Sequence, residues 1–315
     1  MMVLEDLAFI IGGGQPRASP RVAMGTSFAV VFQTVGLAAL LEAERAARSI
    51  AAHSPALVAA KRLELVAVGD AATLRGRSAG LTRAVDVAAL VPAPLAARVA
   101  AAARRGGGAC RRATCAVDDL RAVREARAAA LPALLRAFAP LLALDADSVA
   151  CGSLEPLLRW GAATPFDVAL RPVPAAVAKG RARAVPRRVP EFNGGFLLLR
   201  NTSGALRFLE RWRALYARSS RTSKHPTSDQ PLLRAALWET GADYRELGRF
   251  YGCPAWADRA ATCAGFAPDA AAREALARKK RQKLGGAHGA LWRAHVRRVD
   301  RGPEACVLLH GAHLA

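Results

Sequence analysis

The chain has 315 residues, which is enough to bury a substantial core in one large domain or two small ones. Hydrophobic residues make up 52 % of the sequence but aromatic residues only 6 %, so much of the apolar content is alanine, a strong helix former of small volume. No apolar run reaches the roughly 20 residues that a membrane span needs. We therefore expect a soluble α/β protein with extensive helix and no membrane span in this chain.

The basic residues give the chain a formal net charge of +21. Six of its 46 basic residues are lysine, which leaves 40 arginines. Such a charge attracts polyanions, but Ala, Arg, Gly and Pro also share GC-rich codons, and the arginines are scattered rather than gathered into one stripe. We therefore expect no nucleic-acid partner, although a positive field would favour a nucleotide diphosphate.

The six cysteines lie at positions 110, 115, 151, 253, 263 and 306. None of them shows C-x2-C spacing, which argues against a structural zinc site. An even number permits disulfides, and the closeness of Cys253 to Cys263 in sequence predicts that these two form a local pair. The redox compartment is not decided by this pattern.

The first 25 residues read as an irregular leader, with Gly12-Gly13-Gly14 followed by Pro16 and Pro20. They lack the basic start and the long apolar stretch of a signal peptide. The expected location is therefore the Golgi or another secretory lumen if an N-terminal anchor is missing, and the cytoplasm otherwise.

A strand, a helix and a second strand are predicted next, over Phe28–Phe32, Leu37–His53 and Leu63–Val68. This βαβ opening implies a parallel sheet. We see no linker that forces two domains, so we predict one domain over residues 26–315.

The middle of the chain is harder to interpret. Residues 71–110 give no clear element, and a short strand is expected around 112–117. A helix is predicted over Asp118–Ala137, where Pro132 should kink or split it. The buried strand Leu141–Leu144 follows.

The remaining predicted elements, in chain order, are a helix over 154–160, a strand over 166–170, a basic loop over 171–191, a strand over 196–199, helices over 204–218 and 228–240, a solvated helix end or loop at the charged run 278–283, and a strand over 306–309.

Asp145 and Asp147 directly follow the buried strand Leu141–Leu144. Ligands of open α/β sheets bind beyond the carboxyl ends of strands, so both carboxylates should lie at the mouth of the sheet. Oxygen ligands suit Mg²⁺ or Mn²⁺, which also bind substrate phosphates. A D-x-D alone is more often a strand-end turn, in which Asp makes local hydrogen bonds.

Three downstream motifs add weight to the carboxylate pair. Asn193-Gly194-Gly195 combines an amide for sugar hydroxyls with two glycines that permit close backbone approach, or it is only a tight turn. Ser228-Asp229-Gln230 begins a predicted helix, where capping alone explains Ser228 and Asp229. His310, after the last predicted strand, offers an imidazole to a metal, or it is an ordinary surface histidine.

The run of these motifs resembles the nucleotide-diphospho-sugar transferases of GT-A fold. The resemblance covers about residues 26–313, through "LALDADSV", "PFDVAL", "FNGGFLLLRNTSGALRFLERW", "SDQPLLRAAL" and "LLHGAH". It implies an α/β fold with a Rossmann-like, mixed but mainly parallel sheet flanked by helices. It also implies a glycosyltransferase, either hexosyl- or pentosyltransferase, that uses a nucleotide sugar.

The resemblance assigns a role to each motif. Asp145 and Asp147 would hold Mn²⁺ (or Mg²⁺) and the donor diphosphate, and His310 would add a metal ligand. The donor-binding set would be Gln33, Thr34, Gly36, Arg127 (or Arg124), Asp145, Asn193, Gly194 and Gly195. Asp229 and Gln230 would lie near the reacting sugar carbon. The chain departs from some relatives because no clear lysine follows His310-Gly311 to neutralise phosphate.

The implied activity moves a sugar from a UDP- or GDP-sugar to a hydroxyl acceptor such as a glycan or glycoprotein. An inverting enzyme needs a general base, for which Asp229 is the candidate, whereas in a retaining enzyme Asp229 or Gln230 would face the sugar. The sequence leaves both open.

Two other functions fit parts of the sequence. Asp145-Ala146-Asp147-Ser148-Val149 also matches the D-x-D-x-[TV] of haloacid-dehalogenase-type phosphatases, with Asp145 as nucleophile. That family normally carries the motif on its first strand, which argues against it. A non-catalytic, basic polyanion-binding protein would rest on charge alone.

Overall fold

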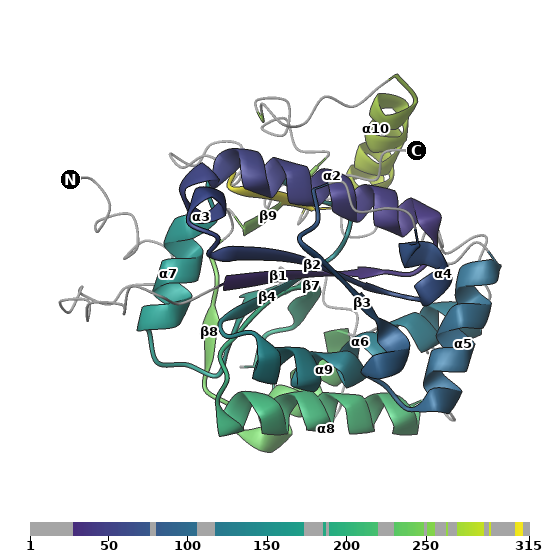
Figure 1. Cartoon of the computed structure of the whole chain (residues 1–315), viewed down its shortest axis with the longest axis vertical. Coiled ribbons are helices and arrows are strands. Elements are labelled where there is room, and N and C mark those ends of the chain that lie inside the picture. The colour runs from purple at the N-terminus through teal and green to yellow at the C-terminus, as the bar shows by residue number, and fades with distance from the viewer. Residues whose placement is uncertain are drawn as a thin grey trace.

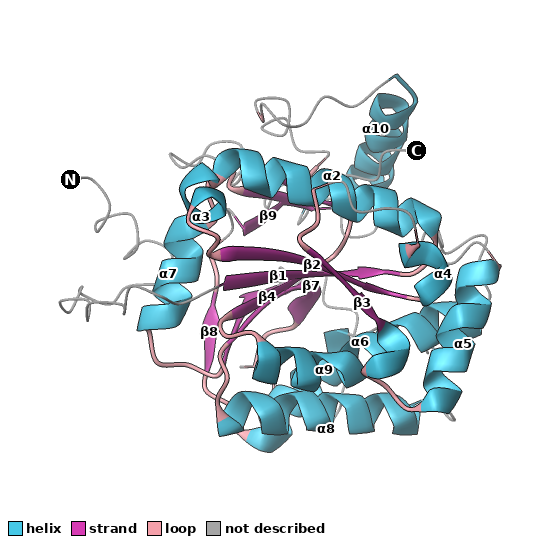
Figure 2. Cartoon of the chain, in the orientation of Figure 1, coloured by secondary structure: helices cyan, strands magenta, loops and turns pink. Residues whose placement is uncertain are grey.

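The computed structural model describes residues 28–75, 80–105, 117–172, 185–186, 189–219, 230–248, 251–255, 263, 270–286, 290 and 306–310. These residues form a large sheet with helices on both faces and a smaller sheet beside it (Figure 1). The alternation of helices and strands along the chain is visible in Figure 2. No helix in these ranges is both long and apolar enough to cross a membrane.

The large sheet has seven strands, and four of them form its parallel part. Its order is β3 (Arg83–Asp86), β2 (Leu63–Gly69), β1 (Phe28–Thr34), β4 (Leu141–Leu144), β7 (Phe192–Leu199), β6 (Val168–Pro172) and β8 (Tyr244–Glu246). Strands β3, β2, β1 and β4 run parallel, and β7 runs antiparallel to both β4 and β6. The predicted mixed, mainly parallel sheet is confirmed.

Helices cover both faces of this sheet. The helices of the described residues are α2 (Leu37–His53), α3 (Pro55–Ala59), α4 (Ala71–Leu74), η1 (Val87–Ala89), α5 (Ala93–Arg104), α6 (Val117–Ala137), α7 (Glu155–Ala163), α8 (Ser203–Ser219), α9 (Gln230–Thr240) and α10 (Ala270–Gly285), of which α10 packs on the small sheet. Helices α2, α3 and α7 pack on one face, and α5, α6, α8 and α9 pack on the other.

The apolar sequence of β1 explains why this strand lies inside the sheet, covered on both faces. Phe28, Val30 and Phe32 belong to the apolar cluster under α2, whereas Ala29 and Val31 belong to the cluster on the α6 face. Because successive side chains of a strand point to opposite faces, a continuous apolar run suits a strand buried on both sides.

The small sheet has the order β5 (Ser148–Ala150), β10 (Leu308–His310) and β9 (Tyr251–Pro254). Strand β10 is antiparallel to β5 and parallel to β9. Its core includes Val149, Leu309 and Leu276 of α10. The small sheet therefore joins the C-terminal part of the chain to the segment that directly follows Asp147.

Several predicted elements differ from those observed. Helix α6 continues through Pro132 instead of splitting, because the helix on either side of it is buried against the sheet. Val117, expected in a strand, is the first residue of that helix, and 112–116 lie outside the described residues, as does the leader 1–25. The charged run 278–283 lies in the C-terminal part of α10, where Arg278, Arg281 and Gln282 are exposed and the three lysines are half-buried.

The predicted Cys253–Cys263 disulfide is wrong. The bonds are Cys151–Cys263 and Cys253–Cys306, with Cα–Cα distances of 4.9 and 6.1 Å. Cys253 lies on β9 and Cys306 just before β10, so the sheet brings together cysteines 53 residues apart in sequence. Closeness in sequence was a poor guide because the pairing follows the sheet. Cys110 and Cys115 lie outside the described residues.

Candidate active site

Asp145 lies at the carboxyl end of β4, one residue beyond the last pair of the β1–β4 ladder, Phe32 and Leu144. Its backbone N–H donates to the carbonyl of Gly195 on β7 at 2.9 Å. Its side chain is 38 % exposed. The strand therefore fixes the backbone of Asp145 while its carboxylate remains accessible at the edge of the sheet.

Arg127 of α6 holds the carboxylate of Asp145. Its Nη1 donates to Oδ1 of Asp145 at 2.6 Å, and the arginine is itself only 9 % exposed. Nη2 of Arg127 is also buried, and within the described ranges no group accepts a hydrogen bond from it. A buried donor without an acceptor costs free energy, so this nitrogen is suited to a ligand oxygen.

Gly195 allows the Asp145 carboxylate to lie against the backbone of β7. A Cβ at position 195 would lie 2.2 Å from Oδ2 of Asp145, which is far inside van der Waals contact. Oδ1 of Asn193 accepts a hydrogen bond from the N–H of Gly195 at 2.8 Å. The Asn-Gly-Gly segment thus shapes the backbone around Asp145, with Gly194 buried between the two.

Asp147 lies directly before the first strand of the small sheet. A two-residue turn leads from Asp145 to β5, and Asp147, directly before Ser148, is 7 % exposed. In the β5–β10 ladder, Ser148 is opposite His310. The backbone therefore brings the predicted third metal ligand next to the carboxylate pair, while the side chain of His310 lies outside the described residues.

Two cations from different helices interact electrostatically with Asp147. Burial lowers the pKa of Arg45 on α2, an effect that Glu42 and Asp147 oppose and Arg48 reinforces. Burial likewise lowers the pKa of Lys279 on α10, opposed by Asp147 and Glu42 and reinforced by Lys283. Both cations have therefore given up part of their hydration beside this carboxylate.

The three predicted residues of the first βα turn have different environments. The side-chain amide of Gln33 donates to the carbonyl of Val123 on α6. Thr34 is completely buried. Gly36 has φ of 84°, in the left-handed region that favours glycine, and its N–H donates to Oγ1 of Thr73 at 3.1 Å. That each binds the donor stays a prediction.

A cavity of about 880 Å³ lies beside Gly36. It is lined by residues that follow β1, β2 and β3, including Leu37, Asp70 and Asp86, and by the alanine-rich face of α5. Asp70 accepts from the backbone N–H and from Oγ1 of Thr73, at 2.9 and 2.5 Å. Because β1 to β4 are parallel, this cavity opens at the same edge of the sheet as Asp145.

Only one residue of the predicted catalytic pair lies in the described part of the chain. Gln230 is the first residue of α9 and is half-buried, whereas Asp229 lies outside the described ranges. Sequence reasoning missed Arg45, Asp70, Thr73 and Lys279. An Asp three residues before a Thr, at a helix start, was a capping signal for Asp70.

The donor groups of Asp145 and Asp147 suit a hard divalent ion. Among the described residues no group of three His, Cys, Asp or Glu side chains gathers around one point. Mg²⁺ and similar ions are often held by one or two carboxylates plus substrate phosphates, so two carboxylates are sufficient protein ligands for an ion shared with a diphosphate. These residues therefore fit Mn²⁺ or Mg²⁺.

Comparisons by sequence and by structure give different results. No protein-family model matches the chain, and no curated protein matches its sequence. Among solved structures, mouse xyloside xylosyltransferase 1 in its apo form is 14 % identical over 91 % of this chain and 97 % of its own, with a TM-score of 0.50. The chain has the fold of this transferase. The predicted GT-A-type fold is confirmed.

Two further transferase structures are similar to the chain with TM-scores below 0.5. The galactosyltransferase LgtC, in complex with donor and acceptor sugar analogs, is 16 % identical over 90 % of this chain and 86 % of its own, with a TM-score of 0.48. The glycosyltransferase GlyE of Streptococcus pneumoniae is 15 % identical over 91 % and 54 %, with a TM-score of 0.44.

The phosphatase alternative is not favoured by this fold. Strands β1, β2 and β3 all precede β4, which carries Asp145 at its end. A nucleophilic aspartate of the haloacid-dehalogenase type would be expected after the first strand.

Proposed function

We propose that the chain transfers a sugar from a UDP- or GDP-sugar to a hydroxyl acceptor such as a glycan or glycoprotein, with Mn²⁺ or Mg²⁺ at Asp145 and Asp147. The observation that carries the proposal is the position of these two carboxylates. They lie at the carboxyl end of β4, in a fold shared with a xylosyltransferase, where one is fixed by Arg127 and Gly195 and the other begins the small sheet.

Charge is the central problem of this reaction, because a nucleotide diphosphate leaves as the glycosidic bond breaks. A bound divalent ion would supply positive charge to the leaving diphosphate. Asp145 and Asp147 would hold that ion, and His310 would complete its ligands. Preorganised groups of this kind need no rearrangement when the charge develops.

Arg127 is proposed to orient both Asp145 and the donor. One nitrogen of its guanidinium already donates to Asp145, and the buried second nitrogen is suited to an oxygen of the donor. Asn193 and the two glycines would line the sugar pocket. Asp229 and Gln230 would lie near the reacting carbon, with Asp229 as the general base if the enzyme inverts.

The cavity beside Gly36 is proposed to take the nucleoside. Its volume of about 880 Å³ falls within the range usual for small-molecule sites. Its carboxylates Asp70 and Asp86 can accept hydrogen bonds from an N–H of the base or from a ribose hydroxyl. The diphosphate would then extend toward Asp145 along the same edge of the sheet.

The test is a panel of UDP- and GDP-sugars in Mn²⁺, in which hydrolysis, transfer and the melting temperature are measured. At least one donor should turn over and raise the melting temperature. Asp147→Ala should abolish both effects while the circular dichroism spectrum remains, and Asp118→Ala, at an exposed acid in the first turn of α6, should change neither. A panel without turnover would refute the proposal.

A further inference from the structure

Arg234 is a buried charge on α9 whose partners in the described part of the chain are all backbone carbonyls. The residue is 8 % exposed. Its Nε donates to the carbonyl of Val189 at 2.6 Å. Its Nη2 donates to the carbonyls of Pro186 and Val185, at 2.7 and 3.4 Å. Burial of a charge is costly, so the guanidinium is used here to hold the path of the main chain.

These carbonyls belong to the segment that leads into β7. The backbone N–H of Val189 donates to the carbonyl of Pro186 at 3.0 Å, which closes a turn. Arg234 donates to the carbonyls of both residues, so its planar guanidinium holds the two ends of the turn at once. Phe192, the first residue of β7, follows soon after this turn. The start of β7 is therefore tied to α9 through one side chain.

An apolar side chain would suit the surroundings of Arg234 equally well. Val185 and Val189 are buried in a small apolar cluster with Ala235, and Leu215 of α8 packs partly against it. Replacement of buried ionic groups by apolar residues of similar volume is often neutral or stabilising, whereas buried polar groups can select one conformation. Stability alone therefore does not explain the arginine, but a need for one defined path of this segment does.

The two elements that Arg234 joins carry the amides predicted for the sugar side of the site. Gln230 begins α9 one helical turn before Arg234, and residues four apart lie on the same face of a helix. Asn193 lies in β7, where its Oδ1 accepts from the N–H of Gly195. Helix α9 packs on β7, on the face of the large sheet that α6 and α8 also cover (Figure 1). Movement of the segment before β7 would therefore move one amide relative to the other.

We propose that Arg234 is a positioning residue, which fixes the segment before β7 against α9 so that Asn193 and Gln230 bind the same donor sugar. This inference rests on the proposed function. In that function the nucleoside occupies the cavity beside Gly36, which α9 does not line. The role of Arg234 is therefore confined to orienting the sugar that is transferred.

The test compares turnover with nucleotide binding in the full chain. Arg234→Met keeps a long side chain but loses all three contacts, so kcat with the donor found in the panel should fall about ten- to a hundredfold, because a small misplacement of reacting groups is costly. The Kd of UDP or GDP in Mn²⁺, measured by calorimetry, should stay within about twofold of the wild-type value. Arg213→Met removes an exposed arginine of α8 and should change neither quantity.

Arg234→Lys separates the shape of the side chain from its charge. A lysine nitrogen can donate to one end of the turn but cannot hold both ends, so kcat should lie between the values of the wild type and Arg234→Met. A wild-type kcat in Arg234→Met would overturn the inference. A Kd that rises as much as kcat falls would also overturn it, because the whole site would then be disturbed.

Hydrogen exchange decides the inference even if no nucleotide sugar turns over, an outcome that refutes the proposed function alone. The N–H of Asp145 donates to the carbonyl of Gly195 in β7 at 2.9 Å. This N–H and that of Gly195 should exchange faster in Arg234→Met than in Arg213→Met. Equal exchange in the two variants would show that Arg234 does not hold the start of β7, and the inference would fail.

Discussion

The two sheets that meet at the carboxylate pair are stabilised in different ways. The large sheet is buried between two extensive apolar clusters, one on each face. In the described part of the chain, the core of the small sheet has seven buried residues, and three of them are cysteines in disulfides. Both sheets therefore have an apolar core, and in the small sheet the disulfides add covalent links to it.

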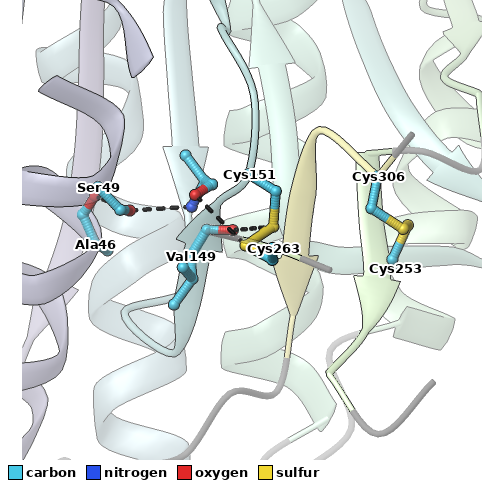
Figure 3. Close-up of a disulfide and its surroundings, with 8 residues drawn as sticks. Ala46, Ser49, Val149, Cys151, Cys253, Cys263 and Cys306 are labelled. Carbon is cyan, nitrogen blue, oxygen red and sulfur yellow. Dashed lines mark hydrogen bonds between the residues drawn. A yellow bond between two sulfur atoms is a disulfide. The ribbon is translucent and has the colours of Figure 1, made fainter. Parts of the chain in front are cut away.

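Each sheet supplies one half of the site. Asp145, Arg127 and Gly195 are held by the large sheet and its helix α6, whereas Asp147 begins the small sheet and His310 ends its central strand. Figure 3 shows the two disulfides on either side of β10. It also shows Oγ of Ser49 on α2, which accepts a hydrogen bond from the backbone N–H of Ala150 on β5. Changes in one sheet should therefore damage one half of the site and leave the other half in place.

The largest effect is expected from removal of the Cys151–Cys263 disulfide. Replacement of both cysteines by serine should cost about 2–5 kcal/mol in the free energy of unfolding, because the bond closes a long loop. Hydrogen exchange should accelerate in β5, β9 and β10 before it does in β1 and β4.

The second disulfide is the matched comparison for the first. The two bonds span 112 and 53 residues, so the loop-entropy model predicts that loss of Cys253–Cys306 costs less, by about 0.7 kcal/mol. If hydrogen exchange accelerated equally in both sheets, the two sheets would not differ in how much they depend on the disulfides. Peptide mapping without reduction should recover both pairs, and a Cys253–Cys263 peptide would contradict the structure.

The next largest effect is expected from a substitution in the large sheet. Gly195→Ala places a methyl group where Oδ2 of Asp145 lies, so the carboxylate must move and Mn²⁺-dependent nucleotide binding should weaken about tenfold or more. Overpacking of this kind costs roughly 1–3 kcal/mol in stability. Gly285→Ala is the control, since nothing lies within 4 Å of its added Cβ, and wild-type binding by Gly195→Ala would contradict the geometry.

Arg127→Met should separate binding from stability. Asp145 is 38 % exposed and can be solvated when the arginine is lost, so the free energy of unfolding should change by no more than about 1 kcal/mol. Donor binding should nevertheless fall. Arg136→Met, on an exposed part of the same helix, serves as the control, and equal binding by the two variants would remove Arg127 from the site.

The smallest effect is expected at the nucleoside cavity. Thr73→Val keeps the shape of the side chain but removes the oxygen that accepts from the N–H of Gly36 and donates to Asp70. The loss should be about 1 kcal/mol, measured as a lower melting temperature, together with weaker nucleotide binding. Weaker pyrophosphate binding as well would contradict the assignment of this cavity to the nucleoside end.

The large sheet could be predicted from sequence because its strands are continuous apolar runs, and β1, β2 and β4 begin at the expected residues. Asp145 follows one of these runs, as expected. Asn193 and Gly195 were expected before a strand over 196–199, but they lie inside β7, which begins at Phe192. The contact between Arg127 and Asp145 could also be predicted in outline, because α6 is the helix that directly precedes β4.

The small sheet could not be predicted in the same way. Its strands β5, β9 and β10 have three or four residues each, too few to show a periodic pattern, and their pairing joins distant parts of the chain. The same long-range pairing decides the disulfides. The charged run of α10 was expected to be a solvated helix end or a loop, and it lies in the C-terminal part of a helix with Arg278, Arg281 and Gln282 exposed.

The position of β10 in the middle of the small sheet also has a consequence for synthesis. Asp145 and β5 leave the ribosome long before residues 308–310, so the N-terminal part of the fold can form while the sheet that begins after Asp147 still lacks its central strand. Until β10 is added, β5 lacks the strand that pairs with it, and the backbone directly after Asp147 has no neighbour in the small sheet.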